Sequence, residues 1–186
     1  MTLNVLVTHA GKNGSTAEIA HWIAETLTAN GLCAHTRPAA LEGAPERYDA
    51  VVLGSALYAG RWHRQARRFA HRHARALAVQ PLWLFSSGPL DTSAADRDLP
   101  PVRAVARLSA HLHARGHATF GGRLAPDAEG PIARMLLRHG RGGDFRDKQQ
   151  IRAWARVIAG ELITAHRAET IQPSAERTSW LSARTS

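Results

Sequence analysis

Six consecutive residues near the N-terminus combine small size with hydrogen-bonding capacity: Gly11, Lys12, Asn13, Gly14, Ser15 and Thr16. They follow an apolar segment and open a segment with helical periodicity. The N–H groups that begin a helix have no partner within it, and the helix dipole favours an anion there. Ser15 and Thr16 add hydroxyl donors, and Gly14 lets the backbone approach a ligand closely. The run therefore predicts a phosphate-binding loop, with a plain connecting turn as the alternative.

Two later segments also place small residues directly after an apolar run. The first comprises Ser55, Ala56, Leu57, Tyr58, Ala59 and Gly60, and the second comprises Ser87, Gly88, Pro89 and Leu90. Tyr58 and the nearby Trp62 can stack on a flat ring, and the backbone amides of the second segment can bind the edge of a heterocycle. Trp62 packing against the next helix, and ordinary turns at Ser and Gly, are the alternatives.

The patterns G-x-x-x-x-G-K-[ST] and G-x-G-x-x-G are both absent from the sequence. Their absence disfavours a P-loop NTPase and a dinucleotide-binding domain built on the glycine fingerprint.

Short apolar runs alternate with amphipathic segments along the chain. The runs predict strands at residues 3–8, 32–37, 50–55, 81–86 and 117–121, and the amphipathic segments predict helices at 16–30, 61–77, 101–115, 131–139 and 147–165. This alternation is typical of a parallel sheet covered by helices on both faces. A mononucleotide would bind at the carboxyl ends of such strands. We expect one domain over residues 1–166 and a polar, loosely ordered tail over 167–186.

The composition is strongly basic, with 24 Lys and Arg against 15 Asp and Glu and a net charge of +9. Such a charge suits an anionic ligand, an anionic membrane surface or nucleic acid. The single cysteine, Cys33, excludes an internal disulfide and is expected in the core. No run approaches the length of a membrane span, and no signal peptide is apparent, so we expect a cytoplasmic protein.

The helix expected at residues 61–77 is rich in both histidine and arginine. Its arginines repel cations, so His63, His71 and His73 do not predict a metal site. Nucleic acid binding is disfavoured because neither groove-reading elements nor stacking aromatics accompany the charge. A second basic segment could rest on anionic lipid headgroups, or form a solvated helix face; it contains Arg134, Met135, Leu136, Leu137, Arg138, His139 and Arg141.

Three segments together resemble the flavodoxin-like superfamily: VLVTHAGKNGSTAEIA, YDAVVLGSALYAGRW and LFSSGPL. The segments GRWHRQARRFAHRHARAL and GGDFRDKQQIRAWARVIAGEL are similar to the menaquinone-dependent protoporphyrinogen oxidase branch. The resemblance covers about residues 1–165. It implies a three-layer α/β/α fold whose five parallel strands are ordered 2-1-3-4-5.

The resemblance also implies non-covalently bound FMN. Its phosphate would lie on residues 12–16, with Gly11 standing where the family usually has a hydroxyl residue. Its ring system would lie between residues 56–60 and 87–90.

An FMN-dependent oxidoreductase is the function that the resemblance implies, with protoporphyrinogen as the specific donor and a quinone as the acceptor. The flavin carries the electrons, so no catalytic side chain is assigned. Arg61, which follows the first ring segment, is the candidate for contact with substrate carboxylates. The alternatives are an electron-transfer flavodoxin that serves a redox protein, and an interaction domain without flavin. Peripheral contact with an anionic membrane and a homodimer both stay open.

Overall fold

A parallel sheet forms the centre of the computed structural model, which describes residues 2–128, 130–140 and 142–182. Its strands are β1 (Asn4–Ala10), β2 (Cys33–Pro38), β3 (Ala50–Tyr58), β5 (Leu82–Ser87) and β6 (Gly116–Phe120). They lie in the order β2-β1-β3-β5-β6, and all neighbours on this path are parallel. The predicted order 2-1-3-4-5 of the parallel strands is thereby confirmed, and the fold is flavodoxin-like.

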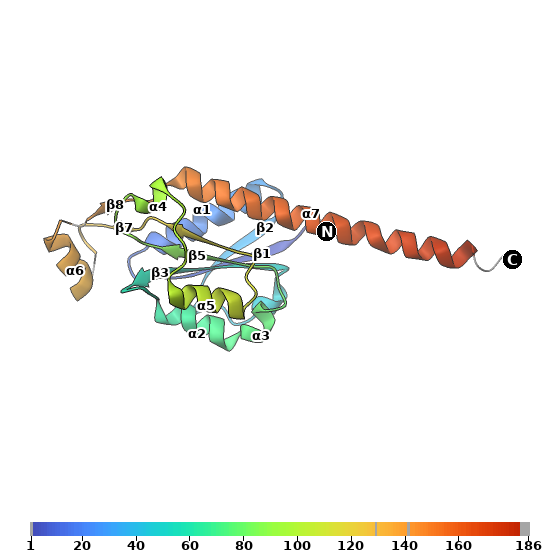
Figure 1. The fold of residues 1–186 in the computed structure, drawn as a ribbon, viewed down its shortest axis with the longest axis horizontal. Coiled ribbons are helices and arrows are strands. Elements are labelled where there is room, and N and C mark those ends of the chain that lie inside the picture. Colours follow the sequence, from blue (N-terminus) through green and yellow to red (C-terminus); the bar gives the residue numbers. More distant parts are fainter. Residues whose placement is uncertain (1, 129, 141, 183–186) are drawn as a thin grey trace.

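Helices cover both faces of this sheet (Figure 1). One face packs against α1 (Ser15–Ala29) and α7 (Lys148–Ser182), and the other against α2 (Arg64–Arg72), α3 (Ala74–Leu77) and α5 (Arg103–His111). Successive strand residues point to opposite faces. Val5 and Val7 therefore join the first layer of core, and Leu6 joins the second.

The strand β3 is longer than the sequence predicts. It continues through Ala56 to Tyr58, turns at Ala59 and Gly60, and returns as β4 (Arg61–Trp62), which pairs antiparallel with the end of β3. Both turn residues have positive φ, 48° and 71°. The strand therefore continues three residues beyond the predicted range of 50–55. The basic helix predicted at residues 61–77 starts only at Arg64 and divides into α2 and α3.

The region between β5 and α7 contains several short elements. Of these, α6 (Pro131–Arg138) matches a predicted helix, and α5 is shorter than its prediction.

Four short elements along the chain were missed by the sequence analysis: η1 (Pro45–Arg47), α4 (Ser93–Asp96), β7 (Arg123–Leu124) and β8 (Gly143–Asp144). Each of these has only two to four residues, too few to show a hydrophobic period.

The final helix also differs from the expectation. Instead of ending near Ala165, α7 continues to Ser182 and extends beyond the sheet (Figure 1). The division into a domain over residues 1–166 and a loosely ordered tail over 167–186 stays a prediction. Residues 166–182 contain no glycine and several good helix formers, although Pro173 removes one helical hydrogen bond. Helix propensity rather than an apolar stripe accounts for this extension, whereas the prediction relied on apolar periodicity. Residues 183–186 lie outside the described part. Within the described ranges, no helix combines the length and the apolar character that crossing a membrane requires.

Candidate functional site

A cavity of about 730 Å³ lies at the carboxyl edge of the sheet. The start of α1, the end of β3, the β4–α2 junction and the segment after β5 form its walls, together with residues 122–124 and α6. This volume is typical of sites for small ligands. The structure therefore brings the three predicted binding segments to one place, 12–16, 56–58 and 87–90.

Most of the predicted binding residues line this cavity: Lys12, Asn13, Ser15, Thr16, Ala56, Leu57, Tyr58, Ser87, Gly88 and Leu90, as well as Arg61. Gly60 and Pro89 line an adjoining cavity instead. Gly11, Gly14, Ser55 and Ala59 line neither of the two. The flavin-binding role of the whole set stays a prediction.

Two of the residues away from the cavity wall have structural roles. The Ser55 hydroxyl accepts a hydrogen bond from the His63 N–H at 2.9 Å and donates to the Ala56 carbonyl at 3.1 Å, which closes the β3–β4 hairpin. A Cβ at Gly11 would lie 2.7 Å from Thr16 Oγ1. Position 11 therefore has no room for a side chain unless Thr16 moves.

The predicted phosphate loop is held by contacts from distant segments. Gly14 precedes α1 with a φ of 75°, a left-handed conformation that favours glycine. The Lys12 N–H donates to the Tyr58 hydroxyl at 3.2 Å. The Ser15 hydroxyl accepts a hydrogen bond from the Arg123 N–H at 3.0 Å, and a hydroxyl that accepts can still donate. These contacts fix the loop against β3 and β7.

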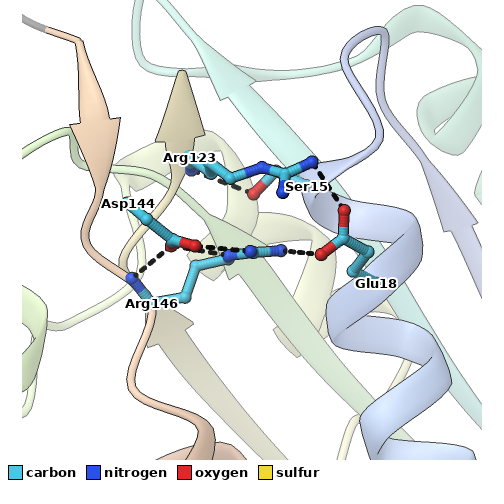
Figure 2. A network of polar contacts seen from close by, with 5 residues as sticks. All are labelled: Ser15, Glu18, Arg123, Asp144 and Arg146. Atoms are coloured by element: carbon cyan, nitrogen blue, oxygen red, sulfur yellow. Dashed lines mark hydrogen bonds and ion pairs between the residues drawn. The ribbon is translucent and has the colours of Figure 1, made fainter. Parts of the chain in front are cut away.

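A network of four charged residues lies beside this loop (Figure 2). Glu18, in the first turn of α1, accepts from Arg123 Nη2 at 2.6 Å and from Arg146 Nη1 at 2.8 Å. Arg146 also holds both oxygens of Asp144, through Nε at 2.8 Å and Nη2 at 2.6 Å. The hydrogen bond from Arg146 lowers the pKa of Asp144, and in turn raises the pKa of Arg146.

The sequence analysis missed this network entirely. Asp144 and Arg146 are two residues apart and could have been noticed as a pair, but Arg123 lies 105 residues from Glu18. No sequence spacing reveals a pair at that distance. The network joins β7 and β8 to the start of α1.

The charge of the cavity wall is one-sided. Among the described residues that line it, none is Asp or Glu, while five are cationic: Lys12, Arg61, Arg64, Arg67 and Arg123. Burial lowers the pKa of His63, and the charges of Lys12, Arg64 and Arg67 lower it further. This electrostatic environment favours an anionic ligand.

A chain of hydrogen bonds runs from Trp62 in the cavity wall through buried Ser86 to the partly buried His117. Trp62 Nε1 donates to Ser86 Oγ at 2.9 Å, and Ser86 Oγ lies 3.0 Å from His117 Nε2. Ser86 Oγ accepts from Trp62, and it either donates to His117 Nε2 or accepts from it, according to the imidazole tautomer. Burial lowers the pKa of His117 to about 4, against a smaller opposing effect of Asp98.

This low pKa predicts acid sensitivity. The unfolded chain takes up the His117 proton near the ordinary pKa of 6.5, whereas the folded protein does so only near 4. The free energy of unfolding should therefore fall as the pH is lowered from about 6.5 to about 4. Urea titrations across this range should show a smaller fall for His117→Asn than for the unsubstituted protein. Burial also lowers the pKa of His9, but His9 titrates in both proteins and contributes equally to both profiles. Equal pH profiles would therefore contradict the low pKa of His117.

The segment predicted to touch a membrane contributes to the cavity. Leu136 of α6 lines it, as does Ala133, whereas Met135 is 50% exposed. The apolar side chains of α6 are thus divided between the cavity and the surface. Arg141 lies outside the described residues, and the membrane contact stays a prediction.

Solved structures with the same fold have low sequence identity to this chain. The rubredoxin:oxygen oxidoreductase of Desulfovibrio gigas matches with a TM-score of 0.59 and 11% identity, over 87% of this chain and 36% of its own. A flavodoxin from the domain Archaea matches with a TM-score of 0.58 and 10% identity, over 86% of this chain and 98% of its own. An oxidoreductase from Corynebacterium diphtheriae matches with a TM-score of 0.58 and 16% identity, over 88% of this chain and 98% of its own. At such identities these similarities show the fold alone.

The chain spans about a third of the length of the Desulfovibrio gigas protein, and nearly the full length of the other two. No curated protein matches the chain. The family comparison is more specific than the structural one, because the Flavodoxin domain family matches residues 6–139. This range is most of the chain and includes the larger part of β1 and the other four strands of the parallel sheet. The protein therefore belongs to the Flavodoxin domain family.

Proposed function

We propose that the protein is an FMN-dependent oxidoreductase whose substrate is an anionic organic molecule. Protoporphyrinogen as the electron donor and a quinone as the acceptor are the specific form of the proposal. The observation that carries it is the single cavity that joins the phosphate loop, both ring segments and five cationic side chains. Family membership supports FMN as the cofactor.

The residues present fit the cofactor at both of its ends. The start of α1 and Lys12 offer N–H donors and positive charge to the phosphate. The two ring segments are neighbours at the cavity, since a Cβ at Gly88 would lie 3.7 Å from Leu57 Cβ. Gly88 also has a φ of 112°, so a larger residue there would be strained. Leu57, Tyr58 and Leu90 supply apolar and aromatic surface for a planar ring.

When bound, FMN supplies the electron transfer itself. The chain's own residues bind and orient the reactants. Arg61, Arg64 and Arg67 line the wall formed by β4 and α2, and they attract carboxylates of a substrate towards the ring segments. We assign Arg61 to substrate contact because it directly follows the β3–β4 turn.

An electron-transfer flavodoxin that serves a redox protein is the second candidate. The specific observation in its favour is the fold shared with proteins described as flavodoxins. The cationic cavity wall argues for a small anionic substrate instead, because a carrier needs no such wall beside its cofactor. An interaction domain without flavin is the third candidate.

The visible absorption spectrum of the purified protein is the first test, before and after incubation with FMN and gel filtration. We expect flavin bands that stay with the protein. Anaerobic addition of protoporphyrinogen should then bleach these bands, and a menaquinone analogue should restore them. Bleaching by dithionite but not by protoporphyrinogen would favour the electron carrier. The absence of retained flavin, even with FMN in excess, would overturn the redox function.

A further inference from the structure

Arg123 is a cavity-lining residue that none of the three binding segments contains. It lies in β7, and its backbone N–H donates to Ser15 Oγ, which places it at the first residue of α1. Arg123 lines the same cavity as Lys12 and Thr16. The residue thus lies beside the start of α1, where the phosphate of FMN would bind.

The side chain of Arg123 is only partly satisfied by its partner. Nη2 donates to Glu18, but Nε is buried and has no hydrogen-bond partner. A buried donor without a partner destabilises the folded protein. A rotamer that turns the guanidinium from Glu18 to an anion in the cavity would remove this destabilisation.

Glu18 keeps one ion-pair partner when Arg123 leaves, although Arg146 is shared with Asp144. Arg146 binds the same carboxylate at 2.8 Å, and its side chain is 3% exposed against 33% for Arg123. Arg146 is further held by Asp144 and stacks over Trp22, with Cζ 4.7 Å from the ring centroid. Arg146 is therefore the fixed partner of Glu18, and Arg123 is the partner that can leave.

We propose that Arg123 binds the phosphate group of FMN and exchanges its ion pair with Glu18 for that contact. The inference rests on the proposed function and adds a residue to the cofactor site. A phosphate carries more charge than a carboxylate and accepts two parallel hydrogen bonds from a guanidinium. Gly11 offers no side chain to the phosphate, so the arginine supplies a contact that the loop itself lacks.

The test compares FMN with riboflavin, which has the same ring system and no phosphate. Fluorescence titrations of the flavin-free protein give both dissociation constants. Arg123→Ala should weaken FMN binding by about tenfold to a hundredfold, the effect of one charge-assisted hydrogen bond, and leave riboflavin binding unchanged. Arg156→Ala on the exposed side of α7 removes the same charge away from the cavity, and it should leave both constants unchanged.

A second variant keeps the proposal testable if Arg123→Ala fails to fold. Glu18→Gln removes the competing carboxylate, so it should tighten FMN binding several-fold, and this gain should shrink when Arg123 is Lys. Equal losses of FMN and riboflavin affinity in Arg123→Ala, or no loss of either, would overturn the inference alone. An unsubstituted protein that binds neither flavin would overturn the proposed function and the inference with it.

Discussion

Gly54→Ala should destabilise the protein by about 3 kcal/mol, the upper end of the cost of overpacking a core. Gly54 lies in β3, between β1 and β5, and is the cross-strand partner of Phe85. A Cβ at this position would lie 1.9 Å from Phe85 Cζ. The ring cannot simply move away, because Phe85 is completely buried and packs against Phe120 and Trp154. The added methyl group must therefore push two strands or the ring apart.

Urea denaturation followed by circular dichroism measures this effect. The matched control is Gly160→Ala in α7, where the same methyl group would meet nothing within 4 Å. Alanine is the better helix former, so the control should gain about 0.5–1 kcal/mol. If both variants shift the denaturation midpoint in the same direction, the close packing of Phe85 over Gly54 does not determine how a side chain at position 54 affects stability.

Reversing two charges on the cavity wall should have the largest effect on activity. In the FMN-loaded protein, Arg64→Glu with Arg67→Glu should lower kcat/KM for an anionic donor by about a hundredfold, roughly tenfold for each reversed charge. Both arginines line the cavity and lie on the exposed side of α2. Activity of the unsubstituted protein should also fall with added salt, since salt screens the attraction.

The control variant reverses two charges on the same helix. Arg68 and Arg72 are exposed on α2 but line neither of the two cavities at the sheet edge. Arg68→Glu with Arg72→Glu should change kcat/KM by less than about threefold, an allowance for the field of the whole protein. Rates are expressed per bound flavin, so weaker cofactor binding does not count as lost turnover. Equal losses in the two double variants would mean that the total charge, not the cavity wall, attracts the donor.

The parallel sheet could be predicted because its signal is local. Each buried strand is a short apolar run, such as the Leu82–Ser87 segment, and the alternation with helices leaves few arrangements of the sheet. The three binding segments followed from the same reasoning, since loops after parallel strands meet at one edge. These features depend on residues that are adjacent in the chain.

Several of the features that were missed depend on contacts between residues that are not adjacent in the chain. The β3–β4 hairpin is closed by the hydrogen bond from the His63 N–H to Ser55, and the end of β3 is held by the hydrogen bond from the Lys12 N–H to Tyr58. Neither contact leaves a pattern in the sequence. The ion pairs of Glu18 join segments more than a hundred residues apart. The extent of α7 was missed for another reason, since its final residues have helix propensity without an apolar period.

The paired strands β7 and β8 have an evolutionary consequence. Arg123 at one end of the intervening segment and Arg146 at the other both bind Glu18, and Leu124 pairs with Gly143. The segment that carries α6 is thus tied together at its base, beside the cavity mouth. Among the described residues between Leu124 and Gly143 there is no strand of the parallel sheet, so we expect changes in this segment to leave the register of that sheet intact. Relatives could diversify by exchanging this one cassette, and a protein engineer could graft a different cassette between the same two arginines.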